Sequence, residues 1–77
     1  MKDELIRQWF EVTNRTVPAG QNTTDFLQQK WAEQIRILDA LLNLGCTQIP
    51  HESTDVPSLR IELKELLRDM NYMIGNS

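Results

Sequence analysis

The 77-residue sequence is poor in several residue types that fix the fold or the chemistry of small proteins. It contains one cysteine, one histidine, three glycines and three prolines. A single cysteine, Cys46, cannot form an internal disulfide, whereas small secreted domains usually need several disulfides. The sequence therefore favours a reducing compartment, and we expect a cytoplasmic protein.

Long hydrophobic runs are also missing. No stretch of the sequence approaches the roughly 20 consecutive apolar residues that a membrane-spanning helix requires. The beginning of the sequence carries Lys2, Asp3 and Glu4, and it is too charged for the start of a secretory signal peptide. We therefore expect neither a membrane span nor a secretion signal.

The sequence also lacks an excess of positive charge. Eleven acidic residues against eight basic ones give a net charge of −3, which disfavours electrostatic attachment to nucleic acid or to an anionic membrane. The length predicts a single domain over residues 1–77, and so small a domain buries only about 60% of its unfolded surface. A protein partner or a second copy of the chain would add stabilising contacts.

Three segments have the apolar spacing of amphipathic helices, and they cover about residues 2–13, 25–44 and 56–74. In the first segment Leu5, Trp9 and Val12 fall on one face. The second segment repeats apolar residues at steps of three and four from Leu27 to Leu42. This pattern predicts an all-α protein.

The third segment has the most regular pattern of the chain. Its apolar residues alternate steps of three and four, as at the a and d positions of a coiled coil: Val56, Leu59, Leu63, Leu66, Met70 and Met73. We expect this seam to face the second helix, with Leu63 and Leu38 in the shared core.

The ends of the second helix have recognisable signals. Thr23, Thr24 or Asp25 can cap its N-terminus, and Gly45 is the expected residue just beyond its C-terminus. Residues 46–54 have no sustained apolar period, so we expect a loop there.

The helix lengths predict the architecture. At about 1.5 Å per residue the second and third helices are each close to 30 Å long, as expected of an antiparallel hairpin. We predict a three-helix bundle in which the short N-terminal helix packs across this hairpin. The short helix leaves one end of the hairpin less covered, and that end is where we expect a partner or a second copy to bind.

Residues for catalysis or metal binding are sparse. Cys46 and His51 are the only soft metal ligands, whereas structural zinc usually takes four ligands. The carboxylates of Glu62, Glu65 and Asp69 belong to the polar side of the third helix, where we expect them to be solvated. Because no glycine-rich phosphate loop or Ser-His-Asp set is present either, we expect no catalytic residue, no metal and no cofactor, and the protein is predicted not to be an enzyme.

A row of basic residues along one edge of the third helix suggests an alternative function. Arg60, Lys64 and Arg68 recur every four residues along the third helix. Acidic residues run alongside this edge, so its field is mixed and short-ranged. We expect no nucleic-acid partner, and a regulator that touches nucleic acid through this edge is kept as an alternative.

Apolar residues outside the seam suggest an interface. Ile61 and Tyr72 lie off the apolar stripe of the third helix, and Arg68 lies between them on nearly the same side. Tyrosine, tryptophan and arginine dominate interface energetics. We therefore predict that Ile61, Arg68 and Tyr72 contact a partner. Trp9 and Trp31 are interpreted as core residues, with Trp9 the more exposed and a further candidate for partner binding.

Together these features predict a small acidic protein that binds a larger protein stoichiometrically, as an inhibitor, an adaptor or a chaperone does. In size, charge and helix content it is similar, as a class, to small proteins of phages and other mobile elements, which include inhibitors of bacterial defence systems. Such likeness of class assigns no functional residue. The alternatives are a self-assembling helical structural subunit, with a homodimer as its simplest form, and the nucleic-acid regulator above.

Overall fold

The structure, a computed structural model, describes residues 1–75 and contains three α-helices in this part of the chain. They are α1 (Lys2–Thr13), α2 (Thr23–Asn43) and α3 (Val56–Gly75). The predicted all-α class is confirmed, and each helix begins and ends within two residues of its predicted limits. The last two residues of the predicted domain, 76 and 77, lie outside the described residues.

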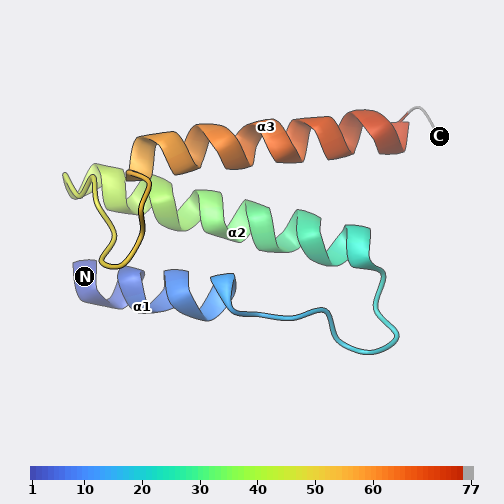
Figure 1. Cartoon of the computed structure of the whole chain (residues 1–77), viewed down its shortest axis with the longest axis horizontal. Coiled ribbons are helices and arrows are strands. Elements are labelled where there is room, and N and C mark those ends of the chain that lie inside the picture. Colours follow the sequence, from blue (N-terminus) through green and yellow to red (C-terminus); the bar gives the residue numbers. More distant parts are fainter. Residues whose placement is uncertain (76–77) are drawn as a thin grey trace.

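The three helices lie side by side, with α2 in the middle and running opposite to both neighbours (Figure 1). Helix α2 packs most extensively against α3 and also packs against α1, whereas the described backbones of α1 and α3 make no contact with each other. The predicted antiparallel hairpin of α2 and α3 is therefore present. The short α1 covers this hairpin from the α2 side.

The central position of α2 explains which of its side chains are buried. Ile37, Leu38 and Leu41 are fully buried, and Gln34 is almost fully buried. Trp31, which the apolar spacing places on the core stripe, is only partly buried. Because both α1 and α3 cover α2, its buried face is wider than one stripe and extends toward α1.

Local signals determine both ends of α2. The Asn22 side chain accepts hydrogen bonds from the backbone N–H groups of Thr24 and Asp25, at 2.8 and 3.3 Å. The cap therefore lies before the threonines and the aspartate that the sequence suggested, because an asparagine side chain satisfies the same amides. At the other end Gly45 has a φ of 77°, and its N–H donates to the Leu42 carbonyl at 2.9 Å. This is the glycine-terminated helix end that was predicted.

The segment between α2 and α3 folds back toward α1 and helps to form the core. Cys46 and Ile49 of this segment are buried, and Figure 1 shows its yellow trace reaching toward the beginning of α1. The Trp9 indole N–H of α1 donates to the Glu52 carboxylate at 3.2 Å. At this end of the molecule the hairpin is covered by α1 and by residues 44–55 together.

The seam of α3 is buried only in its first half. Val56 is fully buried and Leu63 is 9% exposed, but Leu66 is 43% exposed and Met73 is 71% exposed. Helix α1 ends at Thr13, and the segment after α2 covers only the opposite end of the hairpin (Figure 1). The second half of the predicted seam therefore lies on an open face.

Candidate functional site: an apolar groove between α2 and α3

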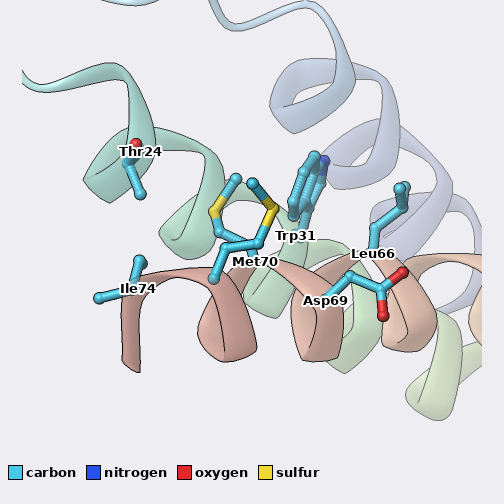
Figure 2. Close-up of a pocket in the computed structure, with 7 residues that line it drawn as sticks. Thr24, Trp31, Leu66, Asp69, Met70 and Ile74 are labelled. Carbon is cyan, nitrogen blue, oxygen red and sulfur yellow. The ribbon is translucent and has the colours of Figure 1, made fainter. Parts of the chain in front are cut away.

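The open face contains a groove with a volume of about 400 Å³. Its lining residues come from the beginning of α2 and the end of α3: Thr24, Trp31, Leu66, Asp69, Met70, Met73 and Ile74. Figure 2 shows Met70 of α3 in the middle of the groove near the Trp31 indole of α2, with Ile74 toward one end of α3 and Leu66 toward the other. The lining is almost wholly apolar, with one hydroxyl and one carboxylate.

Helical geometry explains why these α3 side chains share one surface. Leu66, Met70 and Met73 follow one another at steps of four and three, so they continue the stripe that begins with Val56 and Leu63. The first part of the stripe belongs to the core cluster, and the second part lines the groove together with Thr24 and Trp31 of α2. The groove is the uncovered continuation of the core.

The flexible side chains of the groove suit it to a protein surface. Met70 and Met73 have unbranched, polarisable side chains that adapt to irregular partners. Ile74 is 46% exposed, and together with Met73 and Leu66 it forms a contiguous apolar surface. Isolated exposed apolar residues are ordinary, whereas a contiguous patch is typical of an interaction site.

The charge beside the groove is acidic. Asp69 lines the groove, and Glu62 lies one helical repeat of seven residues before it on the same side of α3. Both residues are exposed. An Arg68 nitrogen lies 3.6 Å from an Asp69 oxygen, and both side chains are largely exposed, so the pair is weak. The carboxylates of Glu62 and Asp69 therefore remain accessible to a partner.

A second groove lies on the opposite side of the α2–α3 pair and includes part of the basic edge. It has a volume of about 560 Å³ and is lined by Ala32, Ile35, Lys64, Leu67, Arg68 and Asn71. Arg60, the first residue of the basic edge, forms an ion pair with Asp39 of α2. Because one of the three cations neutralises a carboxylate of its own chain, the edge is less basic than the sequence suggested.

The predicted interface residues occupy the outer side of α3. Ile61 is 57% exposed and Tyr72 is 72% exposed, and Arg68 is exposed between them. None of the three lines the apolar groove. The outer patch, defined here as Ile61, Arg68 and Tyr72, is thus accessible, and its part in binding stays a prediction.

Trp9 is placed differently from our expectation. It is 3% exposed, and Trp31 is the more exposed tryptophan. The expectation failed because the segment after α2 folds over Trp9 and supplies Glu52 as acceptor for its indole N–H. Trp9 is therefore a core residue with little surface to offer a partner.

The polar interior is fully bonded in the described part of the chain. Gln34 donates to the Thr13 hydroxyl at 3.0 Å, and the Cys46 thiol donates to the Gln48 carbonyl at 3.1 Å. No buried side-chain nitrogen or oxygen among residues 1–75 lacks a hydrogen-bond partner. These hydrogen bonds stabilise the fold.

The described residues also give no cation site or membrane helix. Across residues 1–75, no three His, Cys, Asp or Glu side chains gather in a way that could hold a metal ion. In the same range none of the helices combines the length and apolarity needed to cross a bilayer.

One ion pair on α1 perturbs titration. The Arg7 guanidinium donates a hydrogen bond to Glu4 and lowers the pKa of the Glu4 carboxyl, with a smaller contribution from Gln8. The same hydrogen bond raises the pKa of Arg7. Both groups are exposed side chains of α1, which contributes no residue to either groove.

No protein-family model matches this sequence, and no curated protein or solved structure matches it either. The chemistry of the surfaces is therefore the basis for inferring function. Of these surfaces, the apolar groove combines exposed hydrophobic area with a defined shape.

Proposed function

We propose that this chain is a non-enzymatic protein-binding module that acts stoichiometrically on a larger cytoplasmic protein and receives part of that protein in the α2–α3 groove. The observation that supports this is the exposed second half of the α3 seam. Leu66, Met73 and Ile74 continue the stripe of the core but remain 43 to 71% exposed. Burying them against a partner would be favourable at about 25 cal/mol per Å² of apolar surface.

The lining favours a protein over other ligands. Small-molecule sites usually enclose their ligand and orient it with several convergent polar groups, whereas this groove has two polar residues, Thr24 and Asp69. Nucleic acid would require a positive surface, and the groove is bordered by carboxylates. An amphipathic helix laid into an apolar groove is a common mode of protein recognition. An inhibitor, an adaptor or a chaperone could each act by such occupancy.

A site-specific cross-linking experiment tests the proposal. A photo-reactive amino acid replaces Met73 in the groove, or replaces Gln29 on the exposed part of α2 as a matched control, and each protein is irradiated in its source cells. We expect a one-to-one adduct with another protein from position 73, absent from position 29 and lost when Leu66→Asp is added. Equal labelling from both positions, or adducts unaffected by Leu66→Asp, would refute the assignment of the groove.

A self-assembling subunit is the second candidate, because the same exposed seam has the a and d spacing of helices that pair with copies of themselves. Sedimentation at two protein concentrations separates the two candidates. A self-assembling subunit would gain mass as the concentration rises, whereas a module for another protein would remain a monomer.

A further inference from the structure

We infer that the groove receives a cationic amphipathic helix of the partner protein, with Lys or Arg residues seven positions apart facing Glu62 and Asp69. This inference rests on the proposed function and adds to it the chemistry of the partner. It follows from the register of α3 and from the distribution of charge on its two sides.

The register places two carboxylates along one edge of the exposed seam. When Val56, Leu63 and Met70 are a positions of a heptad, Glu62 and Asp69 are both g positions, each directly before an a residue. Seven residues correspond to about 10.5 Å along a helix. A helix lying in the groove would therefore meet two negative charges separated by about two turns.

The basic residues of α3 lie on the other side. Lys64 and Arg68 line the second groove, and Arg60 is paired with Asp39 of α2. The groove side thus has acidic flanking positions without a matching cation from the same helix, except for the weak contact of Arg68 with Asp69. Charges at g positions select partners of opposite sign in helix pairing.

The same charges disfavour a second copy of the chain as occupant. In a two-fold dimer the same patch appears on both subunits, and when the two α3 helices pair antiparallel the g positions of the two copies face each other, so Glu62 and Asp69 of one copy would lie opposite those of the other. Like charges across an interface oppose association. The net charge of −3 also opposes the association of two copies. A partner with basic flanks avoids both the repulsion between carboxylates and the repulsion between net charges.

The groove sets the length of the segment that it can hold. Glu62 to Ile74 spans about 18 Å of helix, so a partner helix of about three to four turns would cover the exposed seam and both carboxylates. Its apolar stripe would pack against Met70, Met73 and Trp31, and the methionines tolerate several aliphatic or aromatic side chains. Specificity would then come chiefly from the charged edge.

Two labelled model peptides test the inference with the full chain. Both are 18-residue helices with leucine at a and d positions, and they differ only in having lysine or glutamate at every e and g position. Fluorescence anisotropy measures their affinities at low and high salt. We expect the lysine peptide to bind roughly tenfold more tightly at low salt, with the difference shrinking as salt screens the charges.

Charge reversal supplies the decisive control. Glu62→Lys combined with Asp69→Lys should invert the preference between the two peptides. The matched variant, Asp3→Lys with Glu11→Lys, changes the net charge equally but on α1, and it should retain the preference for the lysine peptide. Circular dichroism of each variant verifies that the helices are intact, and a preference that follows net charge in both variants would overturn the inference.

The outcomes distinguish this inference from the proposed function. If both peptides bind equally and Leu66→Asp abolishes both, the groove binds helices and the inferred charge selection is wrong. If neither peptide binds, the cationic-helix inference is overturned, while the cross-linking experiment at position 73 judges the proposed function separately. Concentration-dependent dimerisation that blocks the groove would identify a second copy as the occupant and overturn both.

Discussion

The two ends of the α2–α3 hairpin are built from the same kind of helix but have different cover. At the end where α2 joins α3, helix α1 and residues 44–55 enclose Val56 and Leu63. At the opposite end, Leu66 and Met73 line the groove beside Thr24 and Trp31 of α2 and stay exposed. The comparison shows that an apolar stripe in the sequence identifies surface whose burial is favourable. The stripe does not reveal whether the chain itself or a partner buries that surface.

The exposed fractions of Leu63 and Leu66, which lie about one helical turn apart, show the same contrast. The two residues are successive members of the same seam, yet one is 9% exposed and the other 43%. The difference arises from elements distant in sequence, because residues of α1 and of the loop before α3 belong to the same buried cluster as Leu63. Stability and binding should therefore separate along α3.

The largest expected effect is at the covered end. Leu63→Asp places a carboxylate in the core without a partner, and we expect it to cost about 3 to 5 kcal/mol, on the order of the total stability of so small a domain. The matched variant Leu66→Asp should cost about 1 kcal/mol or less, because its side chain can remain in solvent. Circular dichroism during thermal unfolding measures both. Equal destabilisation by the two variants would mean that the open end is as well covered as the other.

A smaller effect is expected where α1 meets the loop. Glu52→Ala removes the acceptor of the buried Trp9 indole N–H, and an unsatisfied buried donor costs about 1 to 2 kcal/mol. Glu52→Gln retains an acceptor oxygen and should recover most of the loss. Urea unfolding monitored by tryptophan fluorescence measures the free energy of unfolding. An Ala variant as stable as the Gln variant would show that the hydrogen bond does not hold the loop on α1.

Much of the fold could be predicted because the apolar spacing and the end signals of a helix lie within a short stretch of sequence. The spacing of Leu5, Trp9 and Val12, and the regular seam of α3, need no knowledge of distant residues. The same holds for Gly45, whose positive φ ends α2. The cap at Asn22 was assigned a few residues too late, because several neighbouring residues have side chains able to cap and the spacing alone does not choose among them.

The site could be anticipated only in part. The shortness of the first helix indicated that one end of the hairpin is less covered, and the groove lies there. Its apolar α3 residues Leu66, Met70 and Met73 were assigned to the core, because their spacing is the same as that of Val56 and Leu63. The exposures of Trp9 and Trp31 were interchanged for a related reason, since the loop contact with Glu52 has no periodic signal.

The ion pair between the two long helices should contribute little. Arg60 of α3 pairs with Asp39 of α2. The Arg60 side chain is 34% exposed and the Asp39 side chain is 44% exposed. Exposed pairs are usually worth about 0.2 to 1 kcal/mol, so Arg60→Ala should lower the free energy of unfolding by about 0.5 kcal/mol. Adding Asp39→Ala should cost little more. A double-mutant cycle at low and high salt measures the coupling, and a coupling above about 2 kcal/mol would show that the pair is not screened by solvent.

The smallest effect on the fold is expected at the outer patch. Tyr72 is 72% exposed, so Tyr72→Ala should change the free energy of unfolding by no more than about 0.5 kcal/mol. If a large partner that fills the groove also touches the outer side of α3, the same change should weaken binding by about 1 kcal/mol, or roughly fivefold. Tyr72→Phe retains the ring and should lose less. Affinity for the cross-linked partner and thermal stability are measured on the same Tyr72→Ala sample. A fall in both together would assign Tyr72 to the fold, and unchanged affinity would restrict the binding surface to the groove, because a side chain that a partner covers cannot be shortened to alanine without loss of contact.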